Sequence, residues 1–146
     1  MVDIVCNAGT LIVDSPANGL RYLGFDPSDV YLYSVDNGYG VVNDFFSAEG
    51  LRHRRPDQKA KAITSIAMFY DLEQPRAFVA DVASALAASG IWVIKLHYLP
   101  QMLERNAFGA LVHAHLKYNS PAVLEALLGH KGLYVVSPEH HNATHR

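Results

Sequence analysis

Short apolar runs alternate along this chain with longer segments that have the spacing of helices. Each run is apolar on both faces and closes with a polar residue or a turn, as buried parallel strands do. The predicted strands are residues 2–6, 20–25, 41–42, 62–69, 91–94 and 133–136.

Two of the intervening segments predict amphipathic helices. The first begins with Pro75 in its first turn, carries an apolar residue at every fourth position and ends at Gly90. The second begins with Ser120 as N-cap and Pro121 in its first turn, and ends near Gly129. Strands that alternate with helices predict an α/β fold, Rossmann-like, with a mostly parallel sheet and helices on both faces. The 146 residues predict a single domain, residues 1–146.

The charge of the chain argues against some classes of partner. The formal net charge is −2, so we expect no nucleic-acid partner and no membrane partner. One basic run, residues 52–55 with Lys59 and Lys61 close behind it, is predicted to be a solvated loop.

The N-terminal segment and the cysteine content predict a cytoplasmic location. Residues 1–10 lack the basic and apolar regions of a signal peptide, and no run approaches the length of a membrane span. Cys6 is the single cysteine, so it has no partner for a disulfide within the chain, and we interpret it as a small buried apolar residue.

Polar and aromatic residues follow the predicted strands, where α/β sheets bind their ligands. An acidic residue after the second strand of a nucleotide-binding sheet accepts hydrogen bonds from ribose hydroxyls, and Asp26 has that position. Asp44 follows the third strand, and Phe45 and Phe46 directly after it are suited to flanking an adenine ring.

Several segments in this order resemble the S-adenosylmethionine-dependent C-methyltransferases, especially the deoxysugar C-methyltransferases. The similar strings are VDIVCNAGTLI, LGFDPS, NDFFS, the segment at 60–94, HYLPQMLERNAFGALVHAHLKYNS and HHNATHR. The resemblance covers nearly the whole chain. It implies S-adenosylmethionine as cofactor and C-methyl transfer to a small acceptor, with a sugar nucleotide as the suggested class.

The resemblance also implies the roles of individual residues. The expected cofactor-binding residues are Asp3, Asn7, Gly9, Thr10, Asp26, Asp44, Phe45 and Phe69. The expected catalytic residues are His113, His115 and Tyr98. C-methylation needs a base that removes a proton from a carbon next to a carbonyl, and histidine has a suitable pKa.

The chain departs from the resembled family at positions that matter for the chemistry. Val5 and Ala8 stand where the first motif has glycine and aspartate, and Ala114 replaces the glutamate between the two histidines. A β-branched side chain at position 5 tends to fill the space that the glycine leaves for the cofactor. The chain also corresponds only to the central part of the family, since the zinc-binding and C-terminal regions are absent, so we expect a truncated fold.

Two alternatives remain open at this point. The chain is a catalytically inactive interaction module if Val5, Ala8 and Ala114 have ended cofactor use, and an uncovered sheet edge then predicts a homodimer. Alternatively, it is a His-based or metal-dependent hydrolase that uses the same cleft. No second cluster with metal-ligand spacing accompanies His113 and His115, so we predict no metal site.

Overall fold

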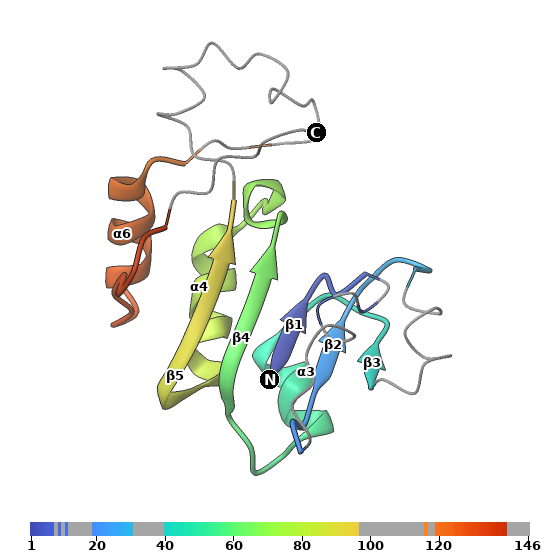
Figure 1. The fold of residues 1–146 in the computed structure, drawn as a ribbon. Helices are drawn as coiled ribbons and strands as arrows, with labels where there is room; N and C mark the ends of the chain where they lie inside the picture. Colours follow the sequence, from blue (N-terminus) through green and yellow to red (C-terminus); the bar gives the residue numbers. More distant parts are fainter. Residues whose placement is uncertain are drawn as a thin grey trace.

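Five parallel strands form the centre of the molecule (Figure 1). The computed structural model describes residues 1–7, 9, 11, 19–30, 40–96, 116 and 119–139. The strands are β1 (Val2–Ile4), β2 (Leu23–Phe25), β3 (Val41–Val42), β4 (Ala60–Ile66) and β5 (Leu86–Lys95). They lie in the order β3-β2-β1-β4-β5, and every described pair is parallel. The predicted α/β fold with a parallel sheet is therefore confirmed.

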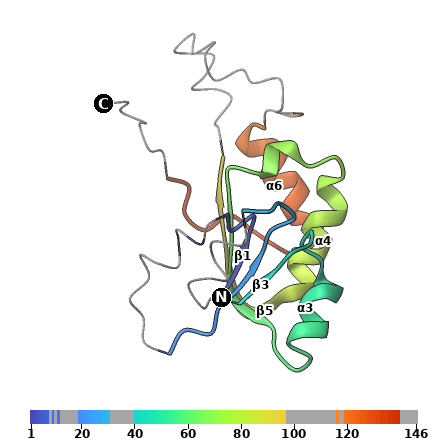
Figure 2. The same ribbon diagram turned by 90° about the vertical axis from the view of Figure 1, so that its right-hand side faces the viewer.

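The described helices lie together on one side of the sheet, as the edge-on view in Figure 2 shows. They are α3 (Ala48–Arg54), α4 (Pro75–Ala85) and α6 (Pro121–Gly129), with the short 3-10 helix η1 (Phe69–Asp71) after β4. The helices predicted for the second face are not among the described elements.

Helices α4 and α6 begin with residue types that favour the start of a helix. Pro75 and Pro121 lie in the first turns, where the missing N–H costs no hydrogen bond. The Ser120 hydroxyl accepts a hydrogen bond from the backbone N–H of Val123, which caps an otherwise unpaired donor. Both predicted helix starts are confirmed.

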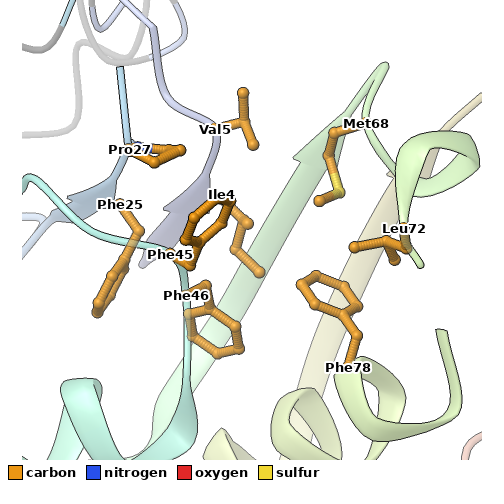
Figure 3. A pocket seen from close by; sticks show the side chains of 9 residues that line it. All are labelled: Ile4, Val5, Phe25, Pro27, Phe45, Phe46, Met68, Leu72 and Phe78. Carbon is orange, nitrogen blue, oxygen red and sulfur yellow. The ribbon is translucent and has the colours of Figure 1, made fainter. Parts of the chain in front are cut away.

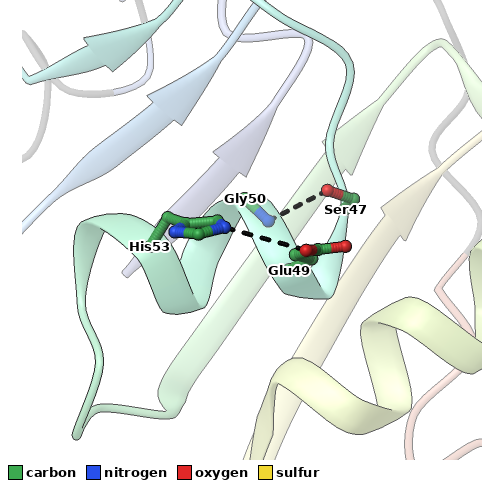
Figure 4. A network of polar contacts seen from close by, with 4 residues as sticks. All are labelled: Ser47, Glu49, Gly50 and His53. Carbon is green, nitrogen blue, oxygen red and sulfur yellow. Dashed lines mark hydrogen bonds and ion pairs between the residues drawn. The ribbon is translucent and has the colours of Figure 1, made fainter.

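The basic run at 52–55 is not a loop, and that prediction was wrong for residues 52–54. They form the second half of α3, which begins where the Ser47 hydroxyl accepts a hydrogen bond of 3.0 Å from the N–H of Gly50 (Figure 4). Leu51 turns inward and anchors the helix at 3% exposure. Arg52 and the exposed pair of Glu49 and His53 face solvent, so the predicted solvation of the run is correct.

Two further predictions of secondary structure are corrected. The helix expected up to Gly90 ends at Ala85, and the next residue already belongs to β5. An added Cβ at Gly90 would lie 2.9 Å from the Ala60 carbonyl oxygen, so the start of β4 packs closely against β5 at this glycine. Residues 133–136 form no strand, and Tyr134 and Val136 are each 82% exposed.

The core lies between the sheet and the described helices. Two clusters of buried residues meet there, one under β1, β2 and α3 and the other under η1, α4 and α6. A chain of tilted and edge-to-face aromatic contacts joins them, from Phe25 through Phe46 and Phe78 to Phe69 and Trp92. This core fixes the strand ends that carry the candidate site.

Candidate functional site

The strand order creates a topological switch point between β1 and β4. The chain leaves β1 toward β2 on one side and returns through β4 on the other, so the loops at the carboxyl ends of these two strands diverge. Ligands of open α/β sheets bind in the crevice at such a point. The described residues among those predicted to follow β1, β2 and β3 lie along this edge.

A small apolar cavity lies at the switch point (Figure 3). Its volume is about 60 Å³, and it is lined by the last residues of β1 and β2, by side chains that follow the first four strands, and by Phe78 of α4. Of the predicted cofactor-binding residues that the structure describes, only Phe45 lines it. Pro27, Met68 and Leu72 line it as well. Pro27 and Met68 lie within two residues of the ends of β2 and β4, a position that could have identified them, whereas Leu72 follows η1.

The loop after β1 turns sharply at a valine. Val5 has a φ of 59° and Asn7 a φ of 48°, in the left-handed region that disfavours β-branched residues. The amides of Val5 and Cys6 both donate to the carbonyl oxygen of Phe25, which holds the turn against β2. Gly9, with φ 75°, continues the turn. The backbone therefore has the path of a glycine-rich loop, although valine occupies its first position.

Asp26 lies at the predicted strand end but is enclosed by protein donors. Its exposure is 1%. One carboxylate oxygen accepts a hydrogen bond of 2.7 Å from the N–H of Asn7, and the other accepts from the N–H and the hydroxyl of Ser28. Asn43 donates to the backbone carbonyl oxygen of Asp26. Asp26 thus ties together the loops that follow β1, β2 and β3.

The residues after β3 differ in accessibility. Phe45 is 76% exposed at the mouth of the cavity, whereas Phe46 is 8% exposed and packs edge-to-face on Phe25. Asp44 is exposed, and its carboxylate accepts a hydrogen bond of 2.7 Å from the N–H of Phe45. Phe45 and Asp44 are therefore free to meet a ligand, whereas Phe46 belongs to the core.

Two other predicted or interpreted residues, Phe69 and Cys6, lie inside the molecule. Phe69 is 1% exposed and contacts Phe78 and Trp92, so it lies in the core rather than along the cavity. Cys6 is 4% exposed, and burial raises its thiol pKa to about 11. The interpretation of Cys6 as a buried apolar residue is confirmed.

Asp3 lies in the middle of β1 and is 3% exposed. The hydroxyl groups of Thr64 and Tyr22 donate to its carboxylate. Burial raises the pKa of this carboxyl above the model-compound value of 3.8, against the opposing effect of the two hydroxyls. Asp3 therefore links β1 to Thr64 of β4 and to Tyr22, which precedes β2.

The raised pKa of Asp3 predicts a specific dependence of stability on pH. The native state binds more protons than the unfolded state between 3.8 and the raised pKa, so stability is highest below this window and falls as pH rises through it. We expect Asp3→Asn to raise the melting temperature at about pH 8 by a few degrees, roughly the effect of 1 kcal/mol. The difference should vanish near pH 4, and Asp57→Asn, an exposed control, should show no such trend. A constant difference between wild type and Asp3→Asn at every pH would contradict the assignment.

The remaining predicted site residues lie outside the described residues: Thr10, Tyr98, His113 and His115. The same holds for six of the eight histidines, so the structure leaves the metal-dependent alternative untested. Among the described residues, no three His, Cys, Asp or Glu side chains are grouped to hold a metal ion. In the same part of the chain, no helix combines the length and hydrophobicity of a membrane span.

Comparison with known proteins identifies similar folds among solved structures. No protein-family model and no curated protein matches the sequence. Solved structures do match: a SAM-dependent methyltransferase from Archaeoglobus fulgidus has a TM-score of 0.72 at 20% identity over 90% of this chain. The plantazolicin methyltransferase BamL, in complex with a triazolic desmethylPZN analog and S-adenosylhomocysteine (SAH), has a TM-score of 0.67 at 18% identity over 89% of it.

A third structure shows that the shared fold does not define one reaction. The cyclopropane synthase MmaA2 from Mycobacterium tuberculosis has a TM-score of 0.66 at 13% identity over 90% of this chain. The chain spans 59%, 52% and 53% of the lengths of these three proteins. The chain therefore has the fold of S-adenosylmethionine-dependent methyltransferases, over somewhat more than half of their length.

Proposed function

We propose that this chain binds S-adenosylmethionine and takes part in transferring its methyl group to a carbon atom of a small-molecule acceptor. The observation that carries the proposal is the placement of Asp26 and Phe45 after adjacent strands, beside the switch point of a methyltransferase fold. Neighbouring structures that contain SAH support the class of cofactor. A sugar nucleotide is the acceptor class that the sequence resemblance favours.

The polar and aromatic residues at the site suit this cofactor, but the cavity is smaller than the cofactor needs. Phe45 offers an open ring for the adenine, and Asp26 offers a carboxylate that already accepts three hydrogen bonds, with limited capacity for ribose hydroxyls. The cavity of about 60 Å³ is well below the several hundred Å³ typical of small-molecule sites. Binding therefore requires Val5 or its neighbours to move.

The division of tasks among residues follows from these positions. The cofactor would supply an electrophilic methyl group when bound. Phe45 and Asp26 would hold it, next to the turn at Val5. His113 or His115 would remove a proton from the acceptor carbon, and Tyr98 would contact the acceptor. Positioning two reactants accounts for a large part of the rate enhancement that such an enzyme needs.

The small cavity favours one alternative, a non-enzymatic interaction module with the same fold. The side chain of Val5 and the apolar lining at the switch point are what such a derivative would show. The homodimer expected with it stays a prediction. β5 is the last strand of the described sheet, and Ile91 and Val93 on it are 64% and 48% exposed.

Titration calorimetry with SAH tests the proposed function. We expect wild-type protein to bind with a micromolar Kd and Phe45→Ala to bind about tenfold more weakly, because the stacked ring is lost. Tyr134→Ala, which removes an equally exposed aromatic side chain outside the cavity lining, is the matched control. Phe45 is largely exposed, so its removal should leave the fold intact. Absence of heat with wild type at millimolar SAH would favour the interaction module.

A further inference from the structure

A second, polar groove lies at the opposite edge of the sheet, where β1, β2 and β4 begin. This edge is the lower one in Figure 1, beside the label of the N-terminus. The groove has a volume of about 40 Å³. A buried water needs about 10–15 Å³ on this scale, so the groove has room for roughly three waters or one tetrahedral oxyanion.

Three cationic side chains line the groove: Arg21 before β2, Arg55 at the end of α3, and Lys59 before β4. Gln58 adds an amide between the last two. The turn that brings them together is held by a hydrogen bond of 3.2 Å from the N–H of Gln58 to the carbonyl oxygen of Arg55. Residues of the basic run in the sequence thus form part of the lining of this groove.

No acidic side chain among the described residues pairs with these three cations. The groove lining contains no Asp or Glu, although the whole chain has more acidic than basic residues, 14 against 12. Within the described residues, the one ion pair between side chains joins His53 to Glu49 and involves none of the three cations. Asp57 lies in the same turn, but its exposed side chain is not part of the lining.

The floor of the groove strengthens its electrostatic field. Val2, Leu23, Leu51 and Ala60 form this floor, and each is at most 7% exposed. Apolar groups lower the local dielectric, so the repulsion among the cations and their attraction for an anion are both larger than in water. The same repulsion is visible at the amino group of Met1, whose pKa is lowered by burial and then by Arg21 and Arg55.

From this arrangement we propose that the groove binds the phosphate group of a small soluble ligand. Guanidinium groups match the geometry of phosphate oxygens and bind them through charge-assisted hydrogen bonds. A volume of about 40 Å³ suits one phosphate group, and a base or a sugar ring would have to lie outside the groove. The site lies at the edge opposite the proposed cofactor cavity, so it does not depend on the proposed methyltransferase function. A ligand there and SAH would be bound at the same time.

Inorganic phosphate is the probe for this site. Its binding is followed by NMR through the backbone amide signals of the isotope-labelled full chain. We expect the signals of Arg55, Gln58 and Lys59 to shift with a low-millimolar Kd when phosphate replaces chloride at equal ionic strength. Arg55→Gln should weaken binding about tenfold, the usual effect of losing a hydrogen bond between charged groups. Arg52→Gln is the matched control, because it removes the same charge from the same helix outside the groove.

Several outcomes would overturn the proposal. One is the absence of shifts at these amides, and another is an equal loss of affinity in Arg55→Gln and Arg52→Gln, which would indicate only a general charge effect. Sedimentation of the chain with anionic phospholipid vesicles but no response to free phosphate would assign the cations to a lipid surface instead. Melting curves of both variants verify that each one is folded, so loss of binding cannot be attributed to unfolding. SAH titration of the same variants separates this result from any failure of the cofactor proposal.

Discussion

Asp26→Ala is expected to lower the free energy of unfolding by about 2–4 kcal/mol, because it leaves buried donors without an acceptor. The carboxylate accepts from the N–H of Asn7 and from both the N–H and the hydroxyl of Ser28, at 1% exposure. Water cannot replace these bonds without opening the turn after β1. The loss should appear in urea titration as a lower midpoint with an unchanged slope.

The neighbouring carboxylate provides the control for this prediction. Asp44→Ala removes the same group from the end of the adjacent strand, but Asp44 is exposed and accepts one described hydrogen bond, from Phe45. Its cost should stay below about 1 kcal/mol, as for most surface substitutions. Equal costs for Asp26→Ala and Asp44→Ala would mean that Asp26 does not hold the loops together. A weakened SAH affinity in Asp26→Ala is informative only after its folded fraction has been measured.

Asp26 also illustrates what the sequence could and could not predict. The pattern of apolar runs placed it correctly at a strand end, because strand ends depend on local composition. The donor from Asn7 depends on how two loops meet at the edge of the sheet, and no local sequence pattern encodes that meeting. The donors from Ser28 are local, because they lie two residues along the same loop, as in an Asx turn. The sequence therefore predicted the edge on which Asp26 lies, but not the degree to which protein groups already occupy its oxygens.

The errors in secondary structure have similar causes. Leu86 continues the apolar spacing of α4, yet it pairs with Ala60 at the start of β5, so strand pairing overrides the local helical pattern. Helix α3 was missed because it is short and mainly polar, with Leu51 as its one large buried residue. Ser47 was the available signal, since serine before Ala48 and Glu49 is a common helix start. The short strand at Val41–Val42 was predicted correctly from its closing polar residues.

Val5→Gly is the substitution expected to increase affinity for SAH, by about tenfold. Val5 lies at the rim of the cavity between Pro27 and Met68 (Figure 3). Its side chain occupies the space through which the loop would approach a cofactor. For scale, one methylene more or less on a substrate in an apolar pocket changes discrimination by a factor of about 10–200, so tenfold lies at the lower end of that range. Calorimetric titration of wild type and variant with SAH measures the change directly.

The backbone at Val5 keeps the stability effect of this substitution small. A β-branched residue at φ 59° is strained by about 1–2 kcal/mol, which glycine relieves. Glycine also gives the unfolded chain more freedom, at a cost of roughly 0.5–1 kcal/mol. The two terms nearly offset, so the melting temperature should change little. A large loss of stability would mean that the contacts of the Val5 side chain outweigh its backbone strain.

The variant Val5→Ala distinguishes the effect of the space that the side chain fills from the effect of the strained backbone. It removes two methyl groups but keeps a Cβ at positive φ, so it should gain part of the affinity without the gain in backbone freedom. Tight binding by Val5→Gly and weak binding by wild type would mean that one side chain limits an otherwise intact cofactor site. Equal, weak affinities in all three proteins would place the obstruction elsewhere in the apolar lining. In that case the fold would be better explained as an interaction module, in which Phe45 and the carboxyl edge serve another partner.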